Sequence, residues 1–239
     1  MIRKNIHFSV DDTFGCFQWL YHNQNSVKDI FDSSTFCYAR YLYENYGVRT
    51  TFYCIYTDGK ASLSDIDSRW SNKFQECGDW MKFGFHCYDM NSDYSTATIN
   101  EIERDYIKVY EALARITGGG KCFTDTLRLH LFSGNEAVVG FLKKHGIEKL
   151  LCADDDRKSY DLTEETVIEL KEKGNYRNKN TGMEYIRTNF RVENMNCIKA
   201  EMLKDIISMD SDIVIFTHER YLKDQEIRNN LESVFRYIM

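Results

Sequence analysis

Short apolar runs alternate with amphipathic segments along the chain, a pattern typical of an α/β protein. Runs rich in β-branched and aromatic residues predict strands at 6–10, 48–56, 82–88, 126–132, 150–153, 185–192 and 212–217. Apolar residues spaced three and four positions apart predict helices at 34–46, 62–77, 99–116, 135–145, 163–173, 198–207 and 224–238. Glycines stand where four of these helices should end, at positions 47, 118–120, 146 and 174.

The regular alternation of strands and helices favours either an open parallel sheet or a β/α barrel. No stretch rich in proline, glycine or serine separates one part of the chain from another, and the chain contains no proline at all. We also find no internal repeat in the sequence. The expected organisation is therefore a single domain that spans residues 1–239.

The composition is that of an ordinary globular protein, with 43% hydrophobic, 14% aromatic and 28% charged residues. The formal net charge is -6 and no cluster of basic residues occurs, so nucleic acid is not an expected partner. No apolar run approaches the ~20 residues that a membrane span needs. The first residues resemble no signal peptide, so we expect a cytoplasmic protein. Eight scattered cysteines without a Cys-x-x-Cys pair are expected to be free thiols, most of them buried.

Polar side chains that can bind metals or transfer protons gather at the predicted strand ends. Asp11 and Asp12 follow the first strand, His86 and His130 lie on the third and fourth, and His218 follows the last. The carboxyl ends of barrel strands meet at one rim, where such folds carry out catalysis. An aspartate with two histidines suits a catalytic zinc-type site, with the second acid as a base. Alternatively, the two acids are a helix cap and a turn residue, and the histidines are hydrogen-bonded core residues.

The ordered set of segments resembles the polysaccharide deacetylase superfamily, the NodB-homology domains of carbohydrate esterase family 4. In that family, the first strand runs into Phe-Asp-Asp-Gly and the second strand contains Thr-Phe-Phe. Metal-binding histidines follow a third strand. An arginine motif comes next, and a late strand ends in Leu-His. The matching segments are Ser9-Val10-Asp11-Asp12-Thr13, Thr51-Phe52-Tyr53, Gly84-Phe85-His86, Leu127-Arg128-Leu129, the helix that ends in His145-Gly146-Ile147, and Val214-Ile215-Phe216-Thr217-His218.

This resemblance implies a distorted (β/α)7 barrel, of the glycoside hydrolase and deacetylase type, and metal-dependent deacetylation. It implies that Asp11 is the catalytic base and that Asp12 and His86 bind the metal. It also implies that Arg128 orients the base and that His218 is the general acid. We expect His218 to be supported by Glu219 or by one of the acids at 154–156.

Several positions depart from the family pattern. Met90 stands four residues after His86, where the family has its second metal histidine. His130 is the candidate replacement because it lies two residues past the motif arginine, on the same face of the predicted strand. Asp89 is a weaker alternative. The prolines of the arginine motif are absent, and Thr13 replaces the glycine after the acidic pair, which indicates a divergent branch.

The function expected from the sequence is therefore a metal-dependent hydrolase that removes an N- or O-acetyl group from a sugar-containing substrate, with non-peptide amide bonds as the main target. The expected cofactor is a divalent ion, zinc first, although cobalt, nickel, manganese and iron accept the same ligands. One alternative is an inactive, deacetylase-like binding module, which the missing second-motif histidine favours. A magnesium-dependent phosphohydrolase is a weaker alternative, because the known pattern needs Asp-x-Asp and these acids are adjacent.

Overall fold

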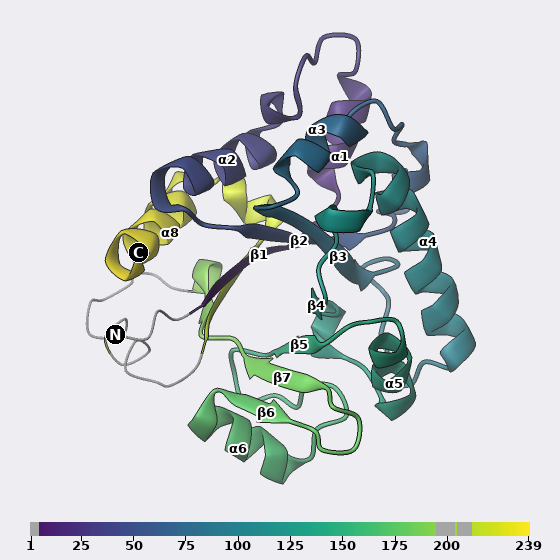
Figure 1. Ribbon diagram of the computed structural model, residues 1–239, viewed down its shortest axis with the longest axis vertical. Coiled ribbons are helices and arrows are strands. Elements are labelled where there is room, and N and C mark those ends of the chain that lie inside the picture. The colour runs from purple at the N-terminus through teal and green to yellow at the C-terminus, as the bar shows by residue number, and fades with distance from the viewer. Residues whose placement is uncertain (1–4, 195–203, 205–211) are drawn as a thin grey trace.

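The computed structural model describes residues 5–194, 204 and 212–239, whose strands form two sheets around a shared interior (Figure 1). The first sheet contains, in spatial order, β3 (Met81–Cys87), β2 (Thr50–Ile55), β1 (Ile6–Thr13), β9 (Ile213–His218) and β8 (Phe190–Arg191). The second contains β4 (Thr126–Leu127), β5 (Lys149–Cys152), β7 (Glu184–Arg187) and β6 (Asn175–Arg177). All neighbouring strands run parallel except β6, which pairs antiparallel with β7.

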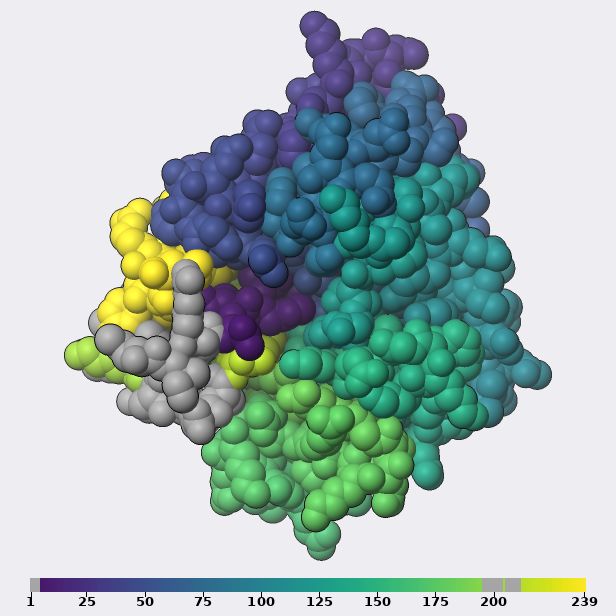
Figure 2. Space-filling view, in the orientation of Figure 1, coloured from purple at the N-terminus to yellow at the C-terminus, as the bar shows by residue number. Residues whose placement is uncertain are grey.

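Helices surround the strands on the outside (Figure 1). They are α1 (Gly15–His22), α2 (Ser34–Tyr46), α3 (Ser71–Cys77), α4 (Ile99–Thr117), α5 (Glu136–Lys144), α6 (Glu164–Lys173) and α8 (Gln225–Ile238). The segment with α6, β6 and β7 lies at the opposite end of the molecule from α1 (Figures 1 and 2). Within the described segments, no helix is both long enough and apolar enough to cross a membrane.

An aromatic cluster fixes three of the helices on the first sheet. Phe17 of α1, Phe36 of α2 and Phe74 of α3 meet Phe52 and Phe83 of the sheet, with ring centroids 5.3–6.4 Å apart. All five rings are completely buried. Burial of each ring contributes about 1.5–3 kcal/mol, and the edge-to-face contacts add to it. The start of α1 is therefore held rigidly beside the end of β1.

The interior of the barrel is polar at its centre because the side chains of β1 alternate between its two faces. Phe8 points outward and packs against Phe235 of α8, with ring centroids 5.3 Å apart. Ser9 and Asp11 point inward instead, and both contact the guanidinium group of Arg128, which follows β4 on the opposite sheet. The alternation thus places Asp11 inside the fold, where it faces Arg128 from the segment after β4.

Most of the predicted elements are confirmed, and three are wrong in part. The predicted helix at 62–77 is interrupted, because the capping box of Ser62 and Asp65 closes a single 3-10 turn and α3 begins only at Ser71. The predicted strand at 126–132 ends at Leu127, after which the chain forms a 3-10 turn at His130–Phe132. The predicted strand at 185–192 divides into β7 and β8, which belong to different sheets.

Two short elements, α1 and β6, were not predicted from the pattern. The predicted helix at 198–207 lies outside the described residues, apart from residue 204. The seven cysteines in the described part of the chain are unpaired, as expected, and six of them are buried.

Candidate metal centre

Two adjacent carboxylates reach the mouth of the barrel because β1 is irregular at its end. On a regular strand, Asp11 and Asp12 would point to opposite faces. The register of β1 against β2 shifts between Val10 and Thr13, and Asp12 adopts a left-handed φ of 54°. Such a φ is unfavourable for a residue with a Cβ atom, and residues of this kind cluster at functional sites. The irregular backbone lets Asp11 face Arg128 in the interior while Asp12 faces the histidines.

Asp12, His86 and His130 each bring a ligand atom to within 4.8 Å of the other two. Asp12 Oδ1 lies 3.3 Å from His86 Nε2 and 3.9 Å from His130 Nδ1. This oxygen is buried and accepts no hydrogen bond within the described structure, which is unfavourable unless another group completes it. One carboxylate oxygen and two imidazole nitrogens form a donor set that divalent zinc-type ions prefer. The residues therefore fit a metal ion, and their role as ligands stays a prediction.

The two histidines reach the centre by different routes. His86 is the second-last residue of β3, and its Nδ1 donates to the carbonyl oxygen of Arg128 at 2.6 Å, which leaves Nε2 with a free lone pair. His130 opens the 3-10 turn after β4, in which Leu131 has a left-handed φ of 57°. The expectation that His130 shares a strand face with Arg128 is wrong, because the strand ends before both residues. The turn places His130 at the mouth instead.

Burial and the charges in this cluster together favour an ionised Asp12 and a neutral His130. Burial raises the pKa of Asp12, but the contact with His86 and the charges of His218 and His130 outweigh burial and lower this pKa to about 2. Burial lowers the pKa of His86, yet the neighbouring Asp12 and Asp11 carboxylates outweigh it and raise that pKa overall. Burial and the charge of His86 lower the pKa of His130. A carboxylate and a neutral imidazole are the forms that bind metals.

Two other polar candidates lie outside the cluster. Asp89, the alternative ligand, accepts hydrogen bonds from the hydroxyl of Ser92 at 3.1 Å and the amide of Asn91 at 2.9 Å, in the turn after β3. His7 stands near the start of β1, where its Nε2 lies 3.1 Å from the hydroxyl of Tyr53. Burial lowers the pKa of His7 to about 3, so this histidine is neutral.

Arg128 holds Asp11 in a buried ion pair. The two side chains are only 1% and 2% exposed, and Nη1 of Arg128 lies 3.1 Å from Oδ1 of Asp11. The same Nη1 donates to the hydroxyl of Ser9 at 2.6 Å, and Nη2 donates to that of Thr188 at 3.0 Å. The guanidinium carbon also lies 4.1 Å from the ring centroid of Phe216. These contacts fix the orientation of the Asp11 carboxylate.

His218 stands directly opposite Asp11, because β1 and β9 pair in parallel with these two residues in register. Its Nδ1 is hydrogen-bonded to a carboxylate oxygen of Glu193, and its Nε2 lies 3.9 Å from Oδ2 of Asp12. Burial raises the pKa of Glu193, but the contact with His218 outweighs burial and lowers it. The carboxylate therefore fixes the orientation of the imidazole.

The acids expected to support His218 are engaged elsewhere, so that expectation is wrong. Glu219 accepts hydrogen bonds from three consecutive backbone N–H groups at the start of α1, at 2.6–2.9 Å. Asp154 pairs with Arg191 at 2.7 Å, and the next two acids pair with exposed basic side chains. Sequence reasoning missed Glu193 because no local pattern marks it, and the pairing of β8 with β9 brings it to the site.

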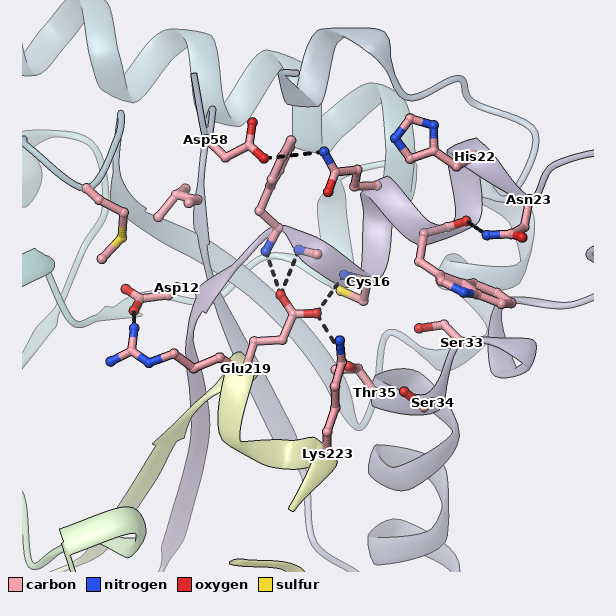
Figure 3. A pocket seen from close by; sticks show the side chains of 17 residues that line it. Asp12, Cys16, His22, Asn23, Ser33, Ser34, Thr35, Asp58, Glu219 and Lys223 are labelled. Atoms are coloured by element: carbon pink, nitrogen blue, oxygen red, sulfur yellow. Dashed lines mark hydrogen bonds and ion pairs between the residues drawn. The ribbon is translucent and has the colours of Figure 1, made fainter. Parts of the chain in front are cut away.

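A pocket of about 530 Å³ opens beside Asp12 (Figure 3). Its walls are α1, the start of α2 and the 3-10 turn Glu219–Lys223 that follows β9. Arg220 on this turn donates from Nη1 to Oδ2 of Asp12 at 3.0 Å. Sequence reasoning also missed Arg220, which lies in an unremarkable polar stretch. One oxygen of Asp12 thus faces the histidines and the other faces an arginine on the pocket wall.

No protein-family model and no curated protein sequence matches the chain. Among solved structures, a protein from Mycobacterium smegmatis that is assigned as a polysaccharide deacetylase matches with a TM-score of 0.54 and 12% sequence identity. The match covers 98% of this chain and 85% of that one. The chain has the polysaccharide deacetylase fold. The distorted (β/α)7 barrel expected from the sequence is thereby confirmed.

Two further structures resemble this deacetylase fold more distantly. A pseudoenzyme of carbohydrate esterase family 4 from Bacillus anthracis matches with a TM-score of 0.44 and 11% identity, over 97% of this chain. The present chain spans 62% of the length of that protein. A family 4 acetyl xylan esterase from Clostridium thermocellum, solved with a cobalt ion, matches with a TM-score of 0.47 and 9% identity, over 96% of this chain and 84% of that one.

Proposed function

We propose that this protein is a metal-dependent hydrolase that removes an acetyl group from nitrogen or oxygen of a carbohydrate-containing substrate. The supporting observation is that three groups meet at one mouth of a deacetylase-type barrel. They are the triad of Asp12, His86 and His130, the carboxylate of Asp11 held by an arginine, and the imidazole of His218 held by a glutamate. A base, an acid and a place for a cation are what amide or ester hydrolysis needs.

The triad would hold the divalent ion, with zinc as the first candidate. When bound, such an ion supplies Lewis acidity, which makes water more acidic and a carbonyl more electrophilic. Asp11 is the residue that accepts a proton from the attacking water, and the pairing with Arg128 keeps its carboxylate fixed for that step. Asp11 needs no contact with the ion for this role.

His218 donates the proton that the leaving group requires. Its Nδ1 is held by Glu193, so Nε2 is the nitrogen that faces the mouth of the barrel. As the bond between the acetyl carbon and the sugar nitrogen or oxygen breaks, Nε2 protonates the departing atom. Asp11 and His218 lie opposite each other on the paired strands β1 and β9. The base for the water and the acid for the leaving group therefore lie on adjacent strands.

The test is metal-dependent release of acetate. The protein is stripped with a chelator, reloaded separately with zinc, cobalt, nickel and manganese, and incubated with N-acetylglucosamine oligomers and acetylated xylo-oligomers. We expect release that requires a metal and that falls by about 10²–10⁴-fold in Asp11→Asn. Failure of the protein to bind any of these ions, or undiminished release by Asp11→Asn, would overturn the proposal.

A second candidate is a binding module that keeps the site without turnover. The ion pair of Arg220 with Asp12 favours it, because the arginine occupies one carboxylate oxygen and adds positive charge beside the triad. Calorimetric metal binding without acetate release from either class of oligomer would support this candidate. Release of acetate by the wild type would exclude it.

A further inference from the structure

We propose that the pocket beside the metal centre binds an anionic group, a phosphate or a carboxylate, carried by the acetylated sugar. This inference rests on the proposed function, because it takes the mouth of the barrel as the place where the acetyl group lies. The pocket is lined by Asp12, Met90, the start of α1 and Trp19. Figure 3 shows it from close by. Its volume of about 530 Å³ is that of a site for a small ligand such as a substituted sugar.

The basic side chains of the pocket have N–H donors that remain available for a ligand. Arg220 and Lys223 lie on the same wall, on the turn after β9. Arg220 uses one nitrogen for Asp12, its side chain is 56% exposed, and a guanidinium group has five N–H donors. Lys223 is exposed and has no ionic partner within the described parts of the chain. Both side chains can therefore donate to a ligand.

The acidic side chains of the pocket are already engaged. The carboxylate of Glu219 is buried and receives three backbone N–H groups of α1 and the hydroxyl of Thr35. Asp58, at the far side, receives two loop N–H groups and the amide of Gln18. The remaining acid, Asp12, belongs to the candidate metal centre. The hydrogen-bonding capacity left over for a ligand is thus mainly that of donors, which suits an anion.

The start of α2 adds a third element to the same wall. Its N-cap residue, Ser33, is 1% exposed and lines the pocket, yet its side chain makes no capping hydrogen bond. The N–H groups of the first turn of this 13-residue helix therefore lack that cap, and the end of a helix where N–H groups are free attracts anions. Trp19, which is 40% exposed, offers an aromatic face on which the apolar side of a sugar ring can pack.

Binding of matched sugars to the metal-loaded protein tests the inference. The background variant is Asp11→Asn, which blocks turnover and lies outside the pocket. Calorimetry compares methyl N-acetylglucosaminide, which is neutral, with N-acetylglucosamine 1-phosphate and with N-acetylglucosaminuronic acid. We expect one of the anionic sugars to bind at least about tenfold more tightly, since charge-assisted bonds add affinity of that order. The tighter of the two identifies the group as phosphate or carboxylate.

Substitutions then assign the preference to the pocket. Lys223→Ala should reduce the ratio of anionic to neutral affinity about five- to tenfold, and Lys223→Arg should largely retain it. Lys179→Ala is the matched control, because this exposed lysine lies on the turn between β6 and β7, at the other end of the molecule. Equal affinities for neutral and anionic sugars, or an unchanged ratio in Lys223→Ala, would overturn the inference.

Acetate release by the wild-type protein separates this inference from the proposed function. Preferential binding of an anionic sugar without release of acetate from any sugar would support the pocket and contradict the hydrolase. Release of acetate at equal rates from neutral and anionic sugars, together with equal binding, would support the hydrolase and contradict the anionic subsite.

Discussion

Replacement of Arg128 by methionine should strongly destabilise the protein, because it leaves a carboxylate buried without its partner. The guanidinium group is 1% exposed and contacts Asp11, Ser9 and Thr188, with Phe216 beneath it. A methionine side chain fills much of the volume of the arginine side chain but has no N–H group to donate to the carboxylate. Removal of one partner of a buried ion pair costs about 3–5 kcal/mol of unfolding free energy, most of it from the uncompensated charge that remains.

The size of the effect makes it measurable by thermal unfolding. For a protein of 150–250 residues, each kcal/mol corresponds to about 2–4 °C in Tm, so Arg128→Met should lower Tm by on the order of 10 °C. Adding Asp11→Asn removes the isolated charge, and the double variant should regain about 2 kcal/mol or more relative to Arg128→Met. Urea unfolding at pH 7 on metal-free protein gives the free energies for this cycle.

Arg157→Met is the matched control. Arg157 also pairs with an aspartate, Asp155, at 2.6 Å, but both side chains are nearly half exposed. A pair of this kind contributes at most about 1 kcal/mol. If Arg128→Met lost no more stability than Arg157→Met, or if Asp11→Asn brought no recovery, the interpretation of Arg128 as the partner of a buried charge would be refuted.

Three further results are expected. Asp11→Asn should abolish acetate release and leave zinc binding largely intact, whereas Asp12→Asn should weaken zinc binding by more than about tenfold; equal losses in a calorimetric titration would mean that the two roles are exchanged. His218→Ala should slow the release of poor amine leaving groups far more than that of activated aryl acetates, which need little protonation; equal losses in a correctly folded variant would contradict the general-acid role. The pKa of His7 is lowered to about 3, so between pH 6.5 and 3 this residue binds a proton only in the unfolded chain, and stability should fall as the pH falls through that window. In His7→Gln the dependence of unfolding free energy on pH should be shallower by up to about 1.4 kcal/mol per pH unit, and an unchanged slope between pH 6 and 4 would disprove it.

The sequence pattern could predict what depends on local periodicity. The amphipathic stripe of α4 and the stop at Gly118 are both visible in the sequence and both appear in the structure. The three candidate ligands also lie together as expected, because the ends of parallel strands meet at one rim. The expected strand position of His130 is wrong, because β4 ends at Leu127, and the turn after it brings the imidazole close to Asp12; its role as a ligand stays a prediction.

What the pattern could not predict depends on contacts between distant segments. Glu193 is one acid in a polar stretch, and only the pairing of β8 with β9 brings it to His218. Arg220 becomes part of the site only through its ion pair with Asp12, which lies 208 residues earlier in the sequence. The turn after β4 contains left-handed backbone at Leu131, and the residue type gives no sign of it, since leucine rarely adopts this conformation.

The central position of β1 in its sheet has a consequence for biosynthesis. One edge of β1 pairs with β2, which follows within about 40 residues, but the other edge pairs with β9, whose first residue is Ile213. At about 5–20 residues per second, the ribosome would need about 10–40 s to deliver that second partner. During this interval the open edge of β1 is free to pair with another nascent chain. Asp11 and His218 meet only when β9 is paired with β1, so the contact between these two candidate catalytic residues is among the last to form during synthesis.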